Sequence, residues 1–143
     1  MNREYEYISA LSAVEKQIFV ECFCCMICSD KNVVKEEIEF LKKIGKMYDI
    51  AEKDIVMVMK SLNKEEILDK VANISTRSKA LHLIKELCYL ANTDSGLDDN
   101  EIDFIIDVAE RLNIENDKIK QVNKWVLDKI LLQKTGDVIL EKE

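Results

Sequence analysis

The chain contains no proline and only three glycines among its 143 residues. Sandwiches and barrels need many tight turns, which are built largely from these two residue types. Apolar residues make up 48% of the chain and charged residues 34%, which is typical of a globular protein with a real core. Strand-like alternation of apolar and polar residues is nowhere sustained. We therefore expect an all-α fold.

Capping residues and apolar spacing predict a compact bundle of about six to eight helices. Ser12 and Glu15 form a capping-box pattern at the first of them. Ser75 is expected to cap a long helix that begins near Thr76. The last clear helix is expected to end near Gln133, with residues 135–143 as a loosely held tail. The predicted helices cover residues 12–28, 35–48, 52–62, a short stretch from 63, 76–93, a stretch from 98, and 116–133.

Two of these helices differ from the others in their apolar pattern. Residues 18–28 and 83–91 are apolar nearly all round, whereas the other helices carry one apolar stripe and one charged face. A helix that is apolar on every side has to be buried. We therefore expect these two segments at the centre and the remaining helices around them.

The sequence aligns with itself when it is shifted by 64 positions, without a gap over roughly 30 residues. Any two pairs of amphipathic helices can be aligned to some extent, but core packing does not demand identical acids at matching positions. The repeat units cover about residues 24–55 and 88–119 and predict a pseudo-twofold bundle. The matching pairs include Cys24 and Cys88, Asp30 and Asp94, Glu37 and Glu101, Ile38 and Ile102, Phe40 and Phe104, and Ile50 and Ile114.

Both repeat units resemble the TerB-like family, which is named for a tellurite-resistance protein and includes the N-terminal domain of some membrane-anchored J-domain co-chaperones. The family pattern is an apolar helix, an Asp-Gly pair, an apolar residue three positions after the Asp and a Glu seven positions after it. The glycine does not follow the Asp directly here; Asn32 and Gly96 stand one place later. The other three positions match in both copies, at Asp30, Val33 and Glu37 and at Asp94, Leu97 and Glu101.

The resemblance implies one all-helical TerB-like domain over residues 1–143. It also implies acidic residues proposed to bind metal, a role in stress or tellurite-related responses, and no established enzymatic activity.

Residues 94–117 carry nine acids and one base, Arg111. Clustered carboxylates are the oxygen ligands that Ca²⁺, Mg²⁺ and Mn²⁺ prefer, although the spacing is not that of an EF-hand. The alternative is that these acids cap helices and favour the positive end of the helix dipole. Asp94, Asp98 and Glu101 are the candidate ligands for a divalent cation, with Asp30 and Glu37 as the weaker twin site.

Other residue types with chemical potential have simpler interpretations. The cysteines are expected to fill core positions, because four of them lie in the most apolar helix; metal or redox chemistry is the alternative. His82 has no motif beside it that supplies a catalytic partner and is expected to be half-buried and structural. Trp125 and Phe104 are expected in the core or along a groove. The cysteines are Cys22, Cys24, Cys25, Cys28 and Cys88.

The net charge, the short apolar stretches and the N-terminal sequence indicate the class of partner and the compartment. The net charge of −7 disfavours a nucleic-acid partner. No apolar stretch approaches the roughly 18 residues of a membrane-spanning helix, and no secretory signal is apparent. With five cysteines expected as reduced thiols, this favours the cytoplasm.

Three functions are compatible with these patterns. The first is a helical module that binds a partner protein and a divalent cation, without enzymatic activity. The second is a metal-dependent hydrolytic enzyme that uses clustered carboxylates. The third is a structural domain that forms homo-oligomers through its apolar helices.

Overall fold

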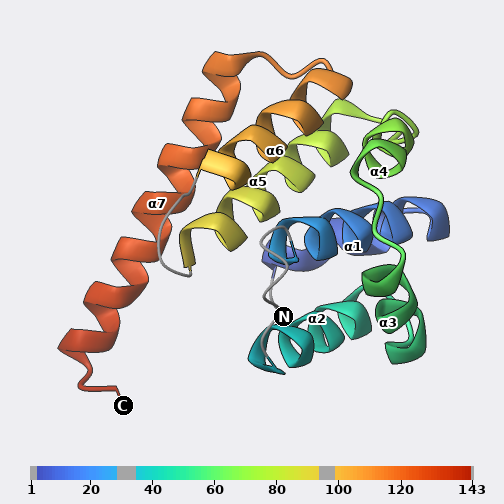
Figure 1. Cartoon of the computed structure of the whole chain (residues 1–143). Coiled ribbons are helices and arrows are strands. Elements are labelled where there is room, and N and C mark those ends of the chain that lie inside the picture. Colours follow the sequence, from blue (N-terminus) through green and yellow to red (C-terminus); the bar gives the residue numbers. More distant parts are fainter. Residues whose placement is uncertain (1–2, 29–34, 94–98, 143) are drawn as a thin grey trace.

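The computed structural model describes residues 3–28, 35–93 and 99–142. These residues form helices and no strand, so the predicted all-α bundle is confirmed (Figure 1). A short 3-10 helix, η1, which the sequence patterns did not predict, precedes the first α-helix. The elements are η1 (Arg3–Ala10), α1 (Ala13–Ile27), α2 (Lys35–Met47), α3 (Glu52–Lys60), α4 (Lys64–Val71), α5 (Arg77–Thr93), α6 (Asp99–Arg111) and α7 (Asn116–Ile139).

Helices α1 and α5 form the centre of the bundle. Helix α1 packs against α2, α3, α4 and α5, and α5 packs against α1, α6 and α7. Phe19, Val20, Leu83 and Ile84 in these two helices have no exposed surface. The two segments that are apolar on every side thus occupy the buried positions predicted for them.

The internal repeat is visible in the helix boundaries. Helices α1, α2 and α3 begin at residues 13, 35 and 52, and α5, α6 and α7 begin 64 positions later in each case. The ends of α2 and α6 are related in the same way, at Met47 and Arg111. The two halves of the chain therefore place equivalent helices in the same order.

The turns after α2 and α6 also match. Asp49 and Asn113 both adopt a left-handed backbone, with φ angles of 60° and 57°. The next amide donates back into the helix with the same geometry: Ile50 N lies 2.8 Å from Gly45 O, and Ile114 N lies 2.8 Å from the oxygen of the equivalent Ala109. Such a left-handed residue is a common helix terminator. The repeat thus extends to the conformation of single residues.

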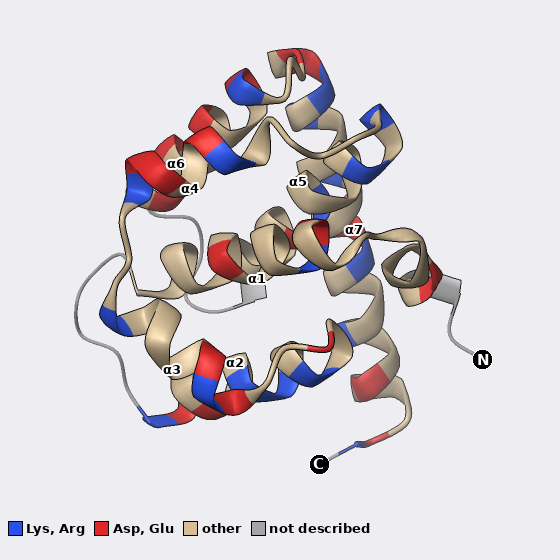
Figure 2. Cartoon of the chain, turned by 90° about the vertical axis from the view of Figure 1, so that its right-hand side faces the viewer, with Lys and Arg blue, Asp and Glu red and all other residues tan. Residues whose placement is uncertain are grey.

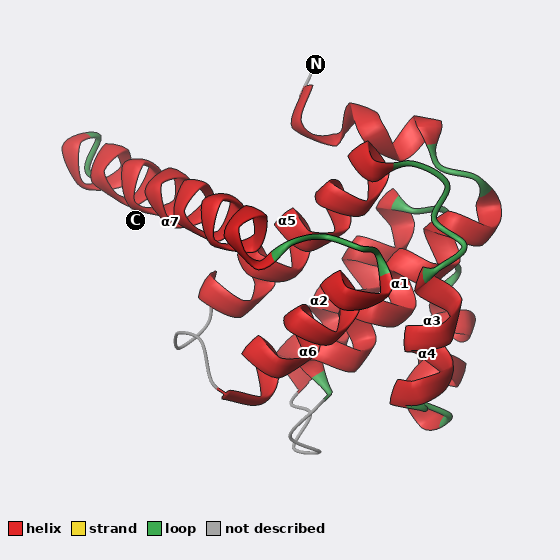
Figure 3. Cartoon of the chain, turned by 90° about the horizontal axis from the view of Figure 1, so that it is seen from above, coloured by secondary structure: helices red, strands yellow, loops and turns green. Residues whose placement is uncertain are grey.

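Helix α7 departs from the repeat. It has 24 residues, whereas the equivalent α3 has 9, and its C-terminal half runs on past α5 (Figures 1 and 3). The helix end expected near Gln133 is wrong, because the helix continues to Ile139. No proline interrupts this segment, and a single glycine, Gly136, weakens a helix by only about 1 kcal/mol. The tail 135–143 is therefore helical over its first five residues.

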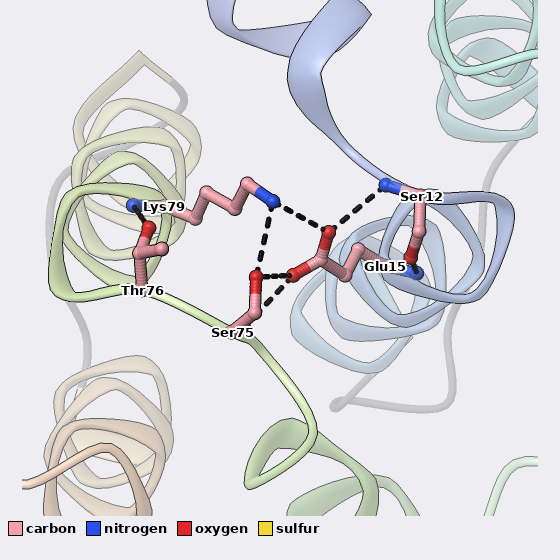
Figure 4. Close-up of polar contacts among 5 residues, drawn as sticks. All are labelled: Ser12, Glu15, Ser75, Thr76 and Lys79. Atoms are coloured by element: carbon pink, nitrogen blue, oxygen red, sulfur yellow. Dashed lines mark hydrogen bonds and ion pairs between the residues drawn. The ribbon is translucent and has the colours of Figure 1, made fainter.

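A polar cluster joins the starts of α1 and α5 (Figure 4). The Glu15 carboxylate, only 3% exposed, accepts hydrogen bonds from Ser12 N at 2.9 Å, Ser75 N at 2.8 Å and Ser75 Oγ at 2.9 Å. Lys79 Nζ lies 3.0 Å from Glu15 Oε1, the oxygen that also accepts from Ser12 N. Thr76 rather than Ser75 caps α5, since Lys79 N donates to Thr76 Oγ1. The cap predicted at Ser75 is therefore displaced by one residue, because Glu15 takes up the Ser75 side chain.

Candidate functional site

The acidic residues predicted to bind a divalent cation divide into two sets. Asp30, Asp94 and Asp98 lie outside the described residues. Glu37 and Glu101 lie in the first turns of α2 and α6, at equivalent positions, where the helix dipole favours carboxylates. Within the described ranges, no three His, Cys, Asp or Glu side chains gather as metal ligands would. Cation binding by these five residues stays a prediction.

The cysteines lie where small apolar residues would. Cys22, Cys24 and Cys88 are buried, and Cys25 and Cys28 are partly buried. Burial raises the pKa of both Cys24 and its repeat equivalent Cys88 to about 12. A thiol that stays protonated at neutral pH is a poor nucleophile and a poor metal ligand, which favours the core-packing interpretation.

The Glu15 cluster contains the residue types of a nucleophile and its base. Ser75 Oγ accepts from Lys79 Nζ at 3.0 Å while it donates to Glu15. Lys79 Nζ also forms an ion pair with Glu15 Oε1 at 3.0 Å. The Ser75 proton is also directed at Glu15 rather than at Lys79. These contacts describe a structural cluster.

A groove runs between α5 and α7. It encloses about 720 Å³, and partly buried Leu81 and Val122 form an apolar floor. Trp125 stands at its edge with 53% of its surface exposed. The eight lining residues are Arg77, Ser78, Leu81, His82, Lys85, Val122, Trp125 and Lys129. Trp125 thus lines a groove, as expected, whereas Phe104 is buried in the core at 4% exposure.

The groove is lined by positively charged side chains, whereas the chain as a whole is negatively charged. Three of the lining side chains are cationic and none is a carboxylate, although the chain carries a net charge of −7. Lys129 Nζ lies 5.6 Å from the centre of the Trp125 ring, within reach of a cation–π interaction. Burial lowers the pKa of Lys129. Elsewhere, acidic and basic segments lie side by side over α2, α3, α4 and α6 (Figure 2).

A series of ring-stacking and hydrogen-bond contacts that starts at η1 holds the back of the groove. The Tyr7 ring stacks on His82, with ring centres 4.1 Å apart, and Lys85 Nζ lies 4.6 Å above the same ring. Tyr7 Oη donates to Glu86 Oε2 at 2.8 Å and lies 2.5 Å from the Tyr48 hydroxyl. Burial, followed by the charge of Glu86, raises the pKa of Tyr7, so this hydroxyl keeps its proton.

The groove cations carry different local partners. Arg77 contacts Glu115 at 2.5 Å, and Lys85 lies 3.7 Å from Glu86. His82 is half-buried, as expected; burial and the charge of Lys85 lower its pKa, which keeps it neutral at physiological pH. The groove therefore combines an apolar floor, one exposed indole and cationic walls, which suits the binding of an anionic amphipathic ligand.

Sequence reasoning did not find most of this groove. Leu81, His82 and Lys85 lie on one face of α5, and Val122, Trp125 and Lys129 lie on one face of α7. Each stripe reads as ordinary helix amphipathicity when it is taken alone. Only the packing of α5 on α7 brings the two faces together.

The search for similar proteins found no matching family model, no matching curated protein and no matching solved structure. The TerB-like resemblance thus rests on the sequence motif alone. Among the helices of the described residues, none combines the length and the apolar character needed to cross a bilayer.

Proposed function

We propose that this chain is a non-enzymatic helical module that binds an acidic amphipathic helix of a partner protein in the groove between α5 and α7. The observation that carries the proposal is the charge of the groove: its walls are cationic and contain no carboxylate, in a chain of net charge −7. Complementary charge steers and selects a partner more than it adds affinity. The apolar floor and Trp125 would supply the affinity.

The dimensions of the groove favour a short helical ligand. Its α5 wall runs from Arg77 to Lys85, which is about 12 Å at the rise of an α-helix. That is a little over two helical turns. An extended peptide would place unpaired backbone groups against Leu81 and Val122, whereas a helix satisfies its own backbone hydrogen bonds. We therefore expect a ligand with two or three apolar residues on one face and carboxylates beside them.

We base the proposed biological role and compartment of this module on the sequence. A protein-interaction role is compatible with the TerB-like resemblance and with a contribution to stress or tellurite-related responses. The free thiols Cys24 and Cys88, both buried in the core, suit a reducing compartment such as the cytoplasm. A divalent cation at the predicted acidic residues would be a separate property, because Glu37 and Glu101, the two of them that the structure describes, do not line the groove.

The proposal can be tested with a designed ligand. A fluorescein-labelled 14-residue peptide with leucines on one helical face and glutamates beside them is titrated with the chain, and anisotropy is followed. The same peptide with lysine in place of glutamate is the control ligand. Trp125 is the only tryptophan, so its emission reports occupation of the groove directly. We expect the acidic peptide to bind more tightly than the basic one, and added salt to weaken that binding.

Two substitutions locate the binding to the groove. Trp125→Ala removes the exposed indole and should weaken binding at least tenfold, which is about 1.4 kcal/mol or more. Lys129→Glu should have a similar effect through charge. Lys124→Glu is the matched control, because Lys124 lies on the same helix with a highly exposed side chain and does not line the groove. Equal binding of both peptides, or binding that Trp125→Ala and Lys129→Glu leave unchanged, would reject the proposal.

A further inference from the structure

A second cavity lies where α5, α6 and α7 pack together (Figure 1). It encloses about 340 Å³, which is within the size range of pockets that bind small molecules. None of the described residues that line it also lines the groove proposed to bind a peptide. On α7, the cavity is lined by residues around Ile119 and the groove by residues around Trp125, on different sides of the helix. The cavity and the groove are therefore separate sites.

The cavity has one apolar wall and one polar wall. The polar side chains of α7 are four and then three residues apart, so they share one side of that helix. Of the described lining residues, one is cationic and none is a carboxylate, although the adjacent residues 94–117 carry nine acids and one base. The apolar wall consists of Ile102, Ile105 and Ile106 of α6, and the polar side chains are Asn116, Lys120 and Asn123 of α7.

The equivalent position in the first half of the chain carries an unbranched apolar side chain. Met59 of α3 stands 64 positions before Asn123 and is partly buried against the core. Methionine is unbranched and fills irregular gaps between packed helices. Asn123 is shorter, and its side-chain oxygen accepts a hydrogen bond from Asn92 Nδ2 of α5 at 2.9 Å. The cavity therefore lies where the first half of the chain places a methionine.

Two further differences between the halves indicate the chemistry of an occupant. Ile106 stands where the first half has Lys42, so the α6 wall of the cavity is wholly apolar. Lys120 stands where the first half has Val56, so the α7 wall carries a cation. Lys120 forms no ion pair with another described residue. A carboxylate is a strong partner for such an ammonium group, and the α6 wall requires an apolar tail.

We infer that this cavity binds an unbranched aliphatic carboxylate, a fatty acid of medium chain length. The alkyl chain lies against the isoleucines of α6, at the place that corresponds to the Met59 side chain. The carboxylate pairs with Lys120 Nζ. Asn123 Nδ2, for which no hydrogen bond is found among the described residues, donates to the same carboxylate. The volume of about 340 Å³ is near the lower limit for ligand pockets, which excludes long chains.

The experiment titrates the full chain with hexanoate, octanoate and 1-octanol by calorimetry. We expect saturable binding of one octanoate per chain. Hexanoate should bind roughly tenfold more weakly, because two fewer methylene groups are buried. Octanol, which lacks the charge, should also bind more weakly than octanoate. Lys120→Gln should remove this preference for the carboxylate. Lys118→Gln is the matched control, because Lys118 lies on the same helix but does not line the cavity.

Filling the cavity locates the binding. Asn123→Met gives the second half the methionine of the first and should abolish octanoate binding, with circular dichroism to confirm the fold. Asn123→Ala removes the same amide but leaves the cavity open, so binding should remain measurable. Trp125→Ala alters only the peptide groove and should change octanoate affinity by less than twofold.

Three results would overturn the inference: no saturable binding at millimolar octanoate, binding that persists in a folded Asn123→Met variant, or binding that Trp125→Ala abolishes. Should Asn123→Met fail to fold, Lys120→Gln decides by itself, because an unchanged preference for octanoate over octanol in that variant would also overturn it.

Discussion

Glu15 and Lys79 occupy the same position in the two halves of the chain, and they bind each other, with Lys79 Nζ 3.0 Å from Glu15 Oε1. Each is the third helical residue after its cap, Ser12 or Thr76. Equivalent residues of a twofold repeat can meet only near its axis. Two identical copies would place like charges there, so this contact requires the two halves to carry different residues at this position.

A second pair of equivalent positions in the two halves also carries opposite charges. Glu21 and Lys85 are also equivalent, and they are 7% and 8% exposed. Here each residue binds a different partner: Glu21 accepts from Lys70 of α4 at 2.9 Å, and Lys85 lies over Tyr7 of η1. Thus α4, which precedes α5, binds the buried charge of α1, and η1, which precedes α1, contacts the buried charge of α5. Buried charges without such partners would be costly.

Replacing the Glu15 carboxylate should destabilise the fold strongly. Glu15→Gln removes the charge that binds Lys79 and three donor groups of Ser12 and Ser75, and we expect a loss of about 2–4 kcal/mol in the free energy of unfolding, measured in urea. Glu66→Gln is the matched control, because Glu66 is also the third residue after a cap but is exposed; it should cost less than about 0.5 kcal/mol. Equal losses in the two variants would show that the cluster contributes nothing specific.

The same carboxylate predicts how stability depends on pH. Burial raises the pKa of Glu15, but hydrogen bonds from Ser12, Ser75 and Lys79 outweigh this and lower it from 4.5 to about 2. Folding therefore favours the charged form. Its contribution is fully present above pH 4.5 and is lost as the pH falls toward 2. Between these values the native chain should lose more stability than Glu15→Gln, and parallel losses would contradict the assignment.

Removing one hydroxyl should loosen η1. Tyr7→Phe leaves the buried Tyr48 hydroxyl and Glu86 without their shared partner, and we expect a loss of about 1–3 kcal/mol. Amide hydrogen exchange in η1 should rise at the same time. Tyr89→Phe serves as the control, since Tyr89 is partly buried but no hydrogen bond of its hydroxyl is found among the described residues. Unchanged exchange in η1 would show that packing alone holds it.

The left-handed residue after α6 gives a prediction of opposite sign. Asn113→Gly should stabilise the chain by roughly 0.5–1 kcal/mol, because glycine adopts a φ of 57° without steric cost. Asn113→Val should destabilise it by about 1–2 kcal/mol for the converse reason. The backbone hydrogen bond from Ile114 N to Ala109 O is available to both variants. Thermal melts that rank valine above glycine would contradict this geometry.

The divalent-cation prediction is tested by calorimetry with Ca²⁺, Mg²⁺ and Mn²⁺. Helix-start amides compete for the same carboxylates, so we expect weak binding, with heat only at millimolar metal. Asp94→Asn combined with Glu101→Gln keeps size and hydrogen bonding and should abolish that heat. Asp30→Asn with Glu37→Gln tests the twin site. Absence of heat from the native chain would leave these residues as helix caps.

The sequence by itself determined the helices, their order and the repeat. Capping residues and apolar spacing act over one or two turns, so Ser12, the two central helices and the 64-residue offset could be read directly. Predictions from local sequence patterns were wrong where a residue far away in the sequence makes the deciding contact. Glu15 takes up Ser75 and moves the cap of α5 to Thr76, and η1 is held by Tyr48 and Glu86, which lie 41 and 79 residues from Tyr7.

Only the tertiary structure decided which faces meet and which stay uncovered. Leu81 and Trp125 belong to separate helices, and their common groove exists because α7 packs on α5. Leu131 and Ile139 are likewise exposed because α7 extends beyond the end of α5. An apolar stripe predicts that a helix will be covered, because water penalises every such stripe equally. Whether the cover is the same chain or another is decided by the arrangement of the helices.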